Sequence, residues 1–459
     1  MELKPGYKMT EEWHNVSLGE LGTFIKGKGI ARTDANSGKI PCIRYGEIYT
    51  THHDIIRNFY SFICQEIAQN ATKLIYGDIL FTCSGETKAE IGKSVAFLYD
   101  IEAYAGGDIL ILRNTKVSPQ FLAYYLNSEQ IVEQKAMLGQ GDAVVHISSS
   151  ALASLQLIIP PSPAEQTAIA TALSDVDALL ASLDALIAKK RDMKQAAMQE
   201  LLTGRRRLPG FGANKNETVH PQDQTSTNEV HRRILKPGYK LTEVGIIPED
   251  WEVKPLSYCV KDLRAGVSVN STKNDSGVAY ILKTSSVYNG KVDLTEIKPV
   301  CLSDIQRLKM PLESDCILIS RMNTPELVGA SGYSRSTYSN IFLPDRLWKT
   351  IKNTKTKTSF LWLSYLLNSQ QFKIIIQDLG TGTSNSMKNI TKEKMLSLVI
   401  PIPNFTEQTA IAAVLSDMDA EIAALEARRA KTQALKQGMM QELLTGRTRL
   451  RPAEGESHA

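Results

Sequence analysis

The chain has 459 residues, 42% of them hydrophobic, and a formal net charge of +4 at pH 7. Its uninterrupted apolar runs are short and its first residues are charged, so we expect neither a membrane span nor a secretion signal. The six cysteines never stand in a Cys-X-X-Cys spacing, which argues against a metal cage and favours a reducing, cytoplasmic compartment. A chain of this length has room for two domains and long helices.

Residues 1–160 predict a first domain with a strand-rich core. Short β-type runs at Asp78–Phe81, Ser94–Leu98 and Ile109–Leu112 are separated by Gly, Asn and Ser turns. The segment holds 14 Lys and Arg against 17 Asp and Glu, a net charge of −3. Bulk charge of this sign would hold nucleic acid poorly, so another subunit would have to supply part of any grip on phosphates.

Residues 161–207 predict a long helix. Apolar side chains recur at alternating steps of three and four residues, which is the heptad pattern of a coiled-coil seam, with Lys190 and Lys194 as polar interruptions. Pro163 precedes the start and Gly204 stands where a C-terminal cap belongs. The expected seam residues are Ile169, Leu173, Val176, Leu180, Leu183, Ile187, Ala197 and Leu201.

Residues 208–235 are polar, rich in turn residues and without periodicity, so they predict a flexible linker. Residues 236–403 predict a second domain of the same α+β class, with strands at Cys316–Ser320 and Leu396–Ile400. This domain holds 22 Lys and Arg against 15 Asp and Glu, a net charge of +7. Its basic character suggests a polyanionic partner.

Residues 404–450 predict a second long helix, preceded by Pro403 and ended by Gly446, and residues 451–459 predict a disordered tail. The middle of this helix is interrupted by Arg429, Thr432 and Lys436. Its expected seam residues are Ile411, Leu415, Met418, Ile422, Leu425, Met439 and Leu443.

The two helical segments are copies of each other. Ala164–Leu208 and Thr406–Leu450 are identical at 28 of 45 positions with a constant offset of 242. Shorter matches lie in the domains, where Leu3–Thr10 returns as Leu235–Thr242 and Phe121–Ser128 resembles Trp362–Ser369. Trp13 also returns as Trp251, and Lys26 as Arg264. The chain is therefore an internal tandem repeat of two variable domains, each followed by the same helix.

An apolar stripe repeated in this way must be buried, and the nearest matching stripe is its own copy. The linker allows the second helix to run back along the first, so we expect an antiparallel coiled coil and a pseudo-twofold molecule. A 40-residue helix is ~60 Å long. Domains mounted at its two ends would lie roughly 10 to 15 DNA base pairs apart, which makes the helices a ruler for DNA.

These features together resemble the DNA specificity subunit of Type I restriction-modification systems. The resemblance rests on the TEQTAIA and QELLTGRxRL segments, the Trp-containing Glu11–Trp13 and Ile247–Trp251, and the duplicated layout, and it covers essentially the whole chain. It implies two target recognition domains that read the halves of a split double-stranded DNA sequence. It also implies two methyltransferase subunits for adenine methylation and motor-nuclease subunits as partners, and no cofactor or catalysis in this chain.

A search for catalytic motifs supports a non-catalytic chain. The glycine-rich cofactor loop and the (N/D)PP(Y/F) motif of a methyltransferase are missing, and Gly29 stands where a phosphate loop needs Ser or Thr after Gly27 and Lys28. Asp78, Glu86 and Lys88 follow the D...ExK order of a metal-dependent nuclease, and Asp315 matches Asp78, but no ExK follows it in the second half. His52 and His53 are adjacent and are expected on the surface, not on a metal.

DNA-reading loops should carry Arg or Lys for guanine, Asn or Gln for adenine, and small hydroxyl groups. The candidates in the first domain are Lys26, Lys28, Arg32, Arg44, Tyr45, Ser84, Lys88 and Gln140. Those in the second are Arg264, Lys273, Asn274, Lys283, Thr284, Arg321, Asn323, Thr381 and Asn385.

Three hypotheses therefore stand: a specificity subunit that directs methylation and restriction by partner subunits, a self-sufficient metal-dependent nuclease, and a structural coiled-coil tether. The tether leaves the basic charge of the second domain unexplained. DNA capture with and without a methyltransferase partner would separate the three.

Overall fold

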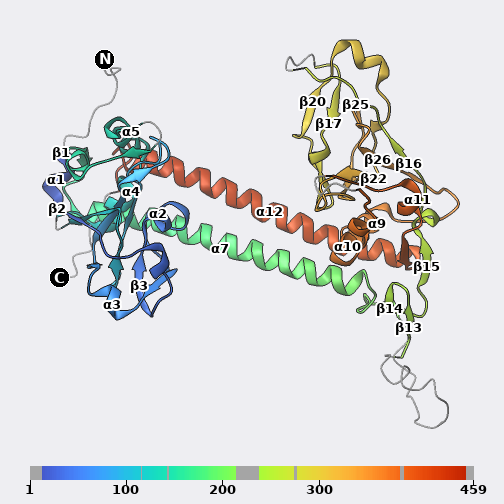
Figure 1. Ribbon diagram of the computed structural model, residues 1–459, viewed down its shortest axis with the longest axis horizontal. Helices are drawn as coiled ribbons and strands as arrows, with labels where there is room; N and C mark the ends of the chain where they lie inside the picture. Colours follow the sequence, from blue (N-terminus) through green and yellow to red (C-terminus); the bar gives the residue numbers. More distant parts are fainter. Residues whose placement is uncertain are drawn as a thin grey trace, which may run out of the picture. The chain divides into compact units, whose positions relative to one another are not determined.

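A computed structural model of the chain describes residues 13–114, 116–141, 144–212, 237–272, 277–382 and 387–450. The expected linker lies almost entirely outside the described residues, and the expected tail wholly so. The chain divides into two compact units, Met1–Ala185 with Glu426–Ala459, and Leu186–Leu425. Each unit therefore joins one strand-rich domain to parts of both long helices, which are labelled α7 and α12 in Figure 1. The fold class is α+β, as predicted.

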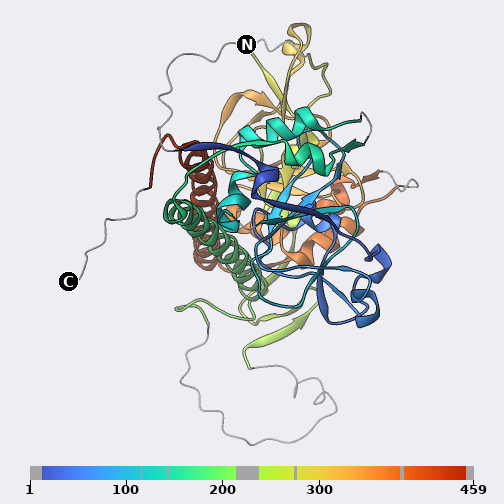
Figure 2. The same ribbon diagram turned by 90° about the vertical axis from the view of Figure 1, so that its left-hand side faces the viewer.

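The first domain is built on two four-stranded sheets. The main sheet has the order β2-β10-β6-β8 and is antiparallel throughout, and the other has the order β4-β3-β9-β5 with one parallel pair, β3 with β9. The strands of the main sheet are β2 (Gly22–Lys26), β6 (Asp78–Thr82), β8 (Ser94–Ala96) and β10 (Ile109–Asn114). Those of the other are β3 (Ile40–Ile43), β4 (Ser61–Ile63), β5 (Thr72–Lys73) and β9 (Tyr104–Ala105). The strands of this domain are drawn in blue to cyan in Figure 2.

The second domain repeats this plan strand for strand. Its sheets have the orders β16-β26-β22-β24 and β20-β17-β25-β21, again with one parallel pair, β17 with β25. The main-sheet strands are β16 (Val260–Ala265), β22 (Cys316–Ser320), β24 (Ser331–Ser334) and β26 (Leu347–Lys352). The others are β17 (Tyr280–Leu282), β20 (Ile297–Pro299), β21 (Pro311–Leu312) and β25 (Tyr338–Phe342). The internal repeat seen in the sequence is thus a repeat of topology.

Core contacts align the two main sheets residue by residue. Phe81 packs in the cluster that contains Trp13, and Ile319 packs in the cluster that contains Trp251. In this alignment the sequence match between Lys26 and Arg264 is wrong, because Ala265 holds the position of Lys26. In the first sheet Leu110 pairs with both Lys26 and Phe81. In the second sheet Trp348 pairs with both Ala265 and Ile319, so Ala265 is the equivalent of Lys26.

Short helices cover the main sheets and fill the cores. Ser118 and Ser359 cap two equivalent helices by accepting backbone N–H bonds, as the preference for Ser at helix starts predicts. Phe121 and Trp362, from the two repeated sequence matches, are fully buried in these helices. The helices of the first domain are α1 (Leu18–Leu21), α2 (Tyr45–Thr50), α3 (Gln65–Ala68), α4 (Pro119–Tyr125), α5 (Glu129–Leu138) and α6 (Ser149–Ala153). Those of the second are α9 (Phe360–Leu367), α10 (Gln370–Asp378) and α11 (Lys392–Leu396).

One predicted strand is partly wrong. The run Leu396–Ile400 begins as the end of α11, where Thr391 accepts a bond from the Lys394 N–H and starts a helical turn. The strand itself is β28 (Val399–Ile402), paired with β15 (Glu252–Pro255), as β12 (Gln156–Ile159) pairs with β1 (His14–Ser17). A further hairpin joins β13 (Tyr239–Thr242) to β14 (Gly245–Pro248).

The two long helices are α7 (Pro163–Leu201) and α12 (Phe405–Leu443). Pro163 is the first residue of α7, where its missing N–H costs nothing. Gly204 and Gly446 both follow the helix ends with φ of +70°, and a Cβ on Gly204 would lie 2.4 Å from Pro248. Both the left-handed backbone and the close approach therefore require glycine at this cap.

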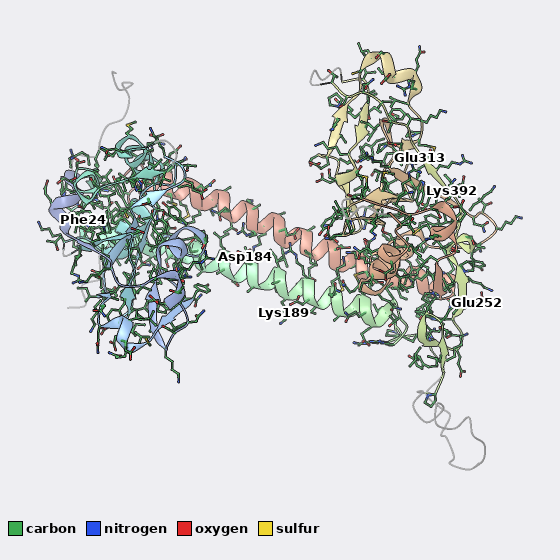
Figure 3. All side chains as sticks on the ribbon, in the orientation of Figure 1. Phe24, Asp184, Lys189, Glu252, Glu313 and Lys392 are labelled. Carbon is green, nitrogen blue, oxygen red and sulfur yellow. The ribbon has the colours of Figure 1, made fainter. Side chains whose placement is uncertain are left out.

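The predicted antiparallel pairing is confirmed in each unit. In the first unit Asp184 of α7 pairs with Arg429 of α12 at 2.8 Å, and Asp177 pairs with Lys436 at 2.8 Å, so one number rises as the other falls. In the second unit Lys190 pairs with Glu421 at 2.6 Å in the same sense. Figure 3 labels Asp184 on α7, and the helices lie side by side in Figures 1 and 2.

The predicted seam is buried, and its ends extend into the domain cores. Leu180, Leu183, Ile187 and Ile422 are between 4% and 7% exposed. At the ends, the seam residues join the clusters of the domains themselves. The half-buried seam positions are Val176, Ala197, Met418, Leu425 and Met439. The fully buried ones at the ends are Ile169, Leu173, Leu201, Ile411, Leu415 and Leu443. In the described part of the chain, no helix is long and apolar enough to cross a membrane.

Candidate nucleic-acid interface

In the first domain three predicted reading residues meet at one small ladder. The strands β7 (Ser84–Gly85) and β11 (Val145–His146) pair, and Gln140 exchanges two backbone bonds with His146 at 2.9 and 2.8 Å. The Ser84 hydroxyl lies 3.0 Å from His146 Nδ1, and the Tyr45 hydroxyl donates to the Ser84 carbonyl at 2.5 Å. The Gln140 and His146 side chains are exposed. This ladder therefore presents a polar edge, which we name the first reading ladder (Ser84, Gln140 and His146).

The second domain has the same ladder with different side chains. The strands β23 (Met322–Asn323) and β27 (Lys388–Asn389) pair, and Thr381 exchanges two backbone bonds with Asn389 at 2.9 Å. The Asn323 amide is used internally, because it donates to the Ser320 hydroxyl at 3.2 Å and accepts from the Thr324 N–H at 2.9 Å. We name Asn323, Thr381 and Asn389 the second reading ladder.

The remaining candidates of the first domain are a mixture of free and engaged side chains. Arg44 is held inside the domain, since its Nε donates to the Ser61 hydroxyl at 2.8 Å and lies 3.4 Å from Glu47. The other four are exposed and form no ion pair with any described residue, so they are available to phosphates. These are Lys26, Lys28, Arg32 and Lys88.

The second domain's remaining candidates are more often engaged. Arg264 pairs with Asp262 at 3.2 Å, and Lys283 pairs with Glu296 at 3.3 Å, next to the half-buried Thr284. Arg321 is half-buried, and within the described parts of the chain its Nε has no hydrogen-bond partner. Three predicted residues lie outside the described residues, namely Lys273, Asn274 and Asn385.

Of the residues considered for metal chemistry, Asp78 is already engaged by another side chain. Both Asp78 oxygens accept bonds from Arg113, at 3.0 and 2.9 Å, and Asp78 is fully buried, so it is not free to hold a metal. Cys316 holds the position of Asp78 in the second sheet, so the predicted match with Asp315 is wrong. Among the described residues no group of three metal ligands is found. The surface prediction is wrong for His52, which is 3% exposed, and burial lowers its pKa.

The residues that sequence reasoning missed lie where the long helices meet the domains. Glu165, at the start of α7, accepts from Arg449, which follows α12, at 2.6 Å. Arg449 also lies over the Trp13 ring, 5.9 Å from its centroid. The repeated TEQTAIA, LTGRxR and Trp motifs therefore form one contact, which we name the first clasp (Glu165, Arg449 and Trp13).

The second clasp has the same composition in the other unit. Glu407 accepts from Arg207 at 2.7 Å, and Arg207 lies 5.8 Å from the Trp251 ring centroid. Trp251 Nε1 also donates to Glu407 at 3.0 Å. Each clasp joins the first residues of one helix copy to the segment after the other copy, so each domain is closed by both halves of the sequence.

A second repeated contact involves the lysines that interrupt the heptads. Lys436 lies between Asp54 and Asp177, 2.8 Å from each, and Tyr124 donates to Asp177 at 2.7 Å. Burial acts to lower the pKa of Lys436, but the two carboxylates outweigh it and the pKa is raised. Because the side chains are only 10% to 17% exposed, this contact fixes α12 to both α7 and the domain.

In the second unit Lys194 takes this role with one carboxylate instead of two. Lys194 pairs with Asp419 at 2.6 Å and lies 5.3 Å from the ring centroid of Tyr365, which donates to Asp419 at 2.7 Å. Burial, together with Asp419, raises the pKa of Tyr365. Lys194 and Lys436 are identical in the two copies of the repeat, and this identity could have indicated a structural role. Because they are polar, they were interpreted only as interruptions of the heptad pattern.

Comparison with known proteins places this architecture. The family model described as the Type I restriction modification DNA specificity domain matches residues 10–189 and 248–436. The chain is 24% identical over 453 residues to the Type I restriction enzyme MjaVIII specificity subunit of Methanocaldococcus jannaschii, covering 97% of this chain and 95% of that protein. It is 25% identical over 413 residues to the EcoKI specificity subunit of Escherichia coli (strain K12), covering 88% and 81%.

Solved structures agree on the fold. The crystal structure of a Type I restriction-modification S subunit from M. genitalium matches with a TM-score of 0.55 and 14% identity, covering 96% of this chain and 98% of that one. A chain from a study of complex assembly and conformational transition of the type I R-M system matches with a TM-score of 0.52 and 16% identity, covering 96% and 100%. By its domains, its repeat and these matches, the chain belongs to the Type I restriction modification DNA specificity family.

Proposed function

We propose that the chain is the subunit that gives a Type I restriction-modification complex its DNA sequence specificity. Each domain reads one half of a split double-stranded DNA target, and the two halves together direct adenine methylation and restriction by partner subunits. The observation that carries the proposal is the contrast between an identical frame and different reading residues. The sheets and clasps repeat, whereas Gln140 and His146 give way to Thr381 and Asn389, and Met322 and Asn323 stand where the first ladder has Ser84 and Gly85.

The chemistry of the two ladders suits base reading. An exposed Gln amide can donate to and accept from adenine in the major groove, and Ser or Thr hydroxyls can serve either base edge. Exposed lysines and arginines in the loops around the first ladder supply phosphate contacts that set the position on the duplex. The excess of basic residues in the second domain adds sequence-independent attraction.

The partners are expected to do the chemistry. The curated relatives are named as specificity subunits of Type I restriction enzymes, and we propose the same non-catalytic role here, with two methyltransferase subunits and motor-nuclease subunits as partners. Two domains and two helices of the same plan would offer two similar surfaces, which suits a partner present in two copies. The engagement of both Asp78 oxygens by Arg113 gives the nuclease alternative no support.

A domain exchange tests the proposal. Residues 14–158 are replaced by the corresponding segment of a relative, and the chain is expressed with its methyltransferase partner in a host without other methylation. Sequencing of the methylated DNA should show one changed half-site and one unchanged half-site. The matched exchange of the second domain should change the other half-site. Methylation with both half-sites changed, or with neither changed, would overturn the proposal.

The helices are proposed to set the spacing between the half-sites. Each has 39 residues and is ~58 Å long at 1.5 Å per residue. Inserting four residues in each, at matching positions between the clasps, adds ~6 Å and should lengthen the unspecified spacer by roughly one or two base pairs. Both half-sites should stay the same. Altered half-sites with an unchanged spacer would contradict this role of the helices.

A further inference from the structure

A cavity of about 810 Å³ lies in the second unit, next to Lys194. Residues of both long helices and of the second domain line it, including Tyr333, Tyr338 and Tyr365. Four cationic side chains also line it: Lys194, Lys291, Arg335 and Lys373. Asp419 is the single acidic residue among the described residues that line the cavity. A concave site of this volume is within the range of small-ligand sites.

Three of these cations have no charge partner among the residues that the structure describes. Lys194 uses Asp419, at 2.6 Å. Lys373 donates to the neutral Asn289 amide at 2.7 Å, and Arg335 donates to the Ser416 hydroxyl at 3.3 Å. No described carboxylate forms an ion pair with Lys291, Arg335 or Lys373. The cavity therefore carries a surplus of positive charge that the described residues do not neutralise.

The equivalent cavity of the first unit, of about 640 Å³, is neutralised from within. There Lys436 lies between Asp54 and Asp177, and Arg57 lies 3.4 Å from Asp177. Asp54 stands just before Ile55, which bridges to the edge strand β8. In both units the long helices contribute a lysine and an aspartate to the cavity. The units differ in the acidic side chain that the domain contributes.

The difference comes down to one equivalent position. In the second unit Gly290 bridges to the edge strand β24, and the residue just before it is Asn289. Gly290 therefore stands where the first unit has Asp54, because the N–H of the equivalent edge-strand residue bonds to the Asp54 carbonyl in one unit and to the Gly290 carbonyl in the other. The second unit has no side chain at this position, and the neutral Asn289 amide beside it accepts from Lys373. Burial, and then repulsion from Lys194, lower the pKa of Lys373.

We propose that the cavity beside Lys194 binds a multiply charged phosphate anion, a chain of two or more phosphate groups. Arg335 and Lys373, with Lys194 behind them, hold its oxygens by charge-assisted hydrogen bonds. The half-buried Tyr338 and the neighbouring Tyr333 provide aromatic walls that a base attached to the phosphates could contact. A single phosphate would leave part of the surplus charge unmatched, so the longer chain is preferred.

The test uses the full-length chain and calorimetric titration with inorganic tripolyphosphate, pyrophosphate and orthophosphate at low salt. We expect one site, with affinity rising along that series. Titration with ATP and GTP identifies the source: binding tighter than tripolyphosphate assigns the site to nucleotides, and equal or weaker binding assigns it to inorganic polyphosphate. Both results keep the oligophosphate site.

Two variants and one control test whether the charged groups of the cavity bind the anion. Asn289→Asp places a carboxylate against the Lys373 ammonium, which already donates to this side chain, without changing shape, and the positive φ of 48° is tolerated by Asp as well as Asn. It should weaken tripolyphosphate binding at least about tenfold by supplying the missing charge partner. The double variant Arg335→Gln with Lys373→Gln should do the same by removing the donors.

The control removes two exposed cations of the same domain outside the cavity, Lys298→Gln with Lys355→Gln, which alters net charge equally. It should leave the affinity within about twofold, because screened charges act weakly at a distance. Equal loss in the control and in the cavity variants would reduce the binding to bulk charge and overturn the site. Unchanged tripolyphosphate binding by Asn289→Asp would also overturn the site. Neither measurement uses sequence-specific DNA, so failure of the oligophosphate site would not count against the proposed function.

Discussion

Arg449 and Glu165 form an ion pair with Nη2 and Oε2 2.6 Å apart, although 284 residues separate them in the chain. Arg207 and Glu407 repeat this relationship across 200 residues in the other unit. The segment that follows one helix copy is thus bound to the first turn of the other copy. Neither domain is therefore closed by residues from its own half of the sequence alone.

Replacing Arg449 by Met should lower the free energy of unfolding of the first unit by about 3 kcal/mol, because Glu165 is left buried without a cation. Glu165 is only 3% exposed, so solvent screens the pair weakly. Arg447→Met is the control, since this arginine is 43% exposed and lies 3.9 Å from Glu442, a geometry worth under about 1 kcal/mol. Urea unfolding with equal midpoints for the two variants would contradict this account of the clasp.

The two heptad lysines should differ in their cost. Lys436→Met leaves Asp54 and Asp177 without their common partner, whereas Lys194→Met leaves only Asp419, which is 26% exposed. We expect a loss of about 3 kcal/mol for the first and about 1 kcal/mol for the second, because solvent screens the more exposed pair. The melting temperatures of the two variants are compared with that of the natural chain. A larger fall for Lys194→Met would show that the buried cluster is not the stronger contact.

The helices and the duplication could be predicted because they depend on local patterns. The spacing of Leu180, Leu183 and Ile187 specifies a buried stripe whatever surrounds it. The strand at Cys316–Ser320 was likewise predicted with its bounds, because five buried residues in a row leave a clear apolar run. The antiparallel direction followed from the repeat and the linker, and the structure confirms it in each unit.

The clasps could not be predicted because the chemistry of a residue depends on distant partners. Nothing near Glu165 in the sequence indicates Arg449, and a charged residue at the start of a helix is ordinarily explained by the helix dipole. The predicted match between strand residues of the two domains was also wrong, because it depends on register. Lys26 and Arg264 match in type, yet the bulge between Val260 and Asp262 in β16 shifts the count by one. Single-residue matches between repeats are therefore weaker than matches of whole elements.

Lys135 should give the first unit a measurable pH dependence. Its ammonium group is fully buried and donates to the Gly92 and Leu126 carbonyls at 2.7 and 2.8 Å, and burial lowers its pKa from 10.5 to about 7. Between these values the unfolded chain holds a proton that the folded chain has released. Raising the pH through that window therefore stabilises the fold, and below pH 7 the full cost of the buried charge remains.

The variant Lys135→Met lacks this contribution, so its stability relative to the natural chain should be greatest near pH 7 and should fall as the pH approaches 10. Melting temperatures of both proteins are measured in one set of buffers, so that the shared titrations cancel in the difference. A difference that stays constant over this range, or that grows with pH, would show that Lys135 does not titrate in the folded state as described.

Gln140 and Asn323 should respond differently to replacement by Ala. Gln140 has an exposed side chain, so its loss should relax base preference at one position of one half-site, by about 1 to 3 kcal/mol, without changing stability. Asn323 holds Ser320 and Thr324 through its amide, so its loss should lower the melting temperature as well. Binding to a library of half-site variants and thermal unfolding are measured on both. Unchanged base preference for Gln140→Ala would remove it from the reading surface.

The charge difference between the two cavities predicts that an oligophosphate site can be moved from one unit to the other. Asp54→Asn leaves Lys436 with Asp177 alone and so reproduces the charge pattern around Lys194, with Arg57 and Lys93 lining the same cavity. This variant should bind two tripolyphosphate ions per chain, and Asp54→Asn combined with Asn289→Asp should bind one, now in the first unit. Calorimetric stoichiometry gives the count, and protection of Lys93 or Lys373 from acetylation by the bound anion gives the place. One ion per chain in Asp54→Asn, with Lys373 protected and Lys93 not, would mean that the number of carboxylates does not decide where the anion binds.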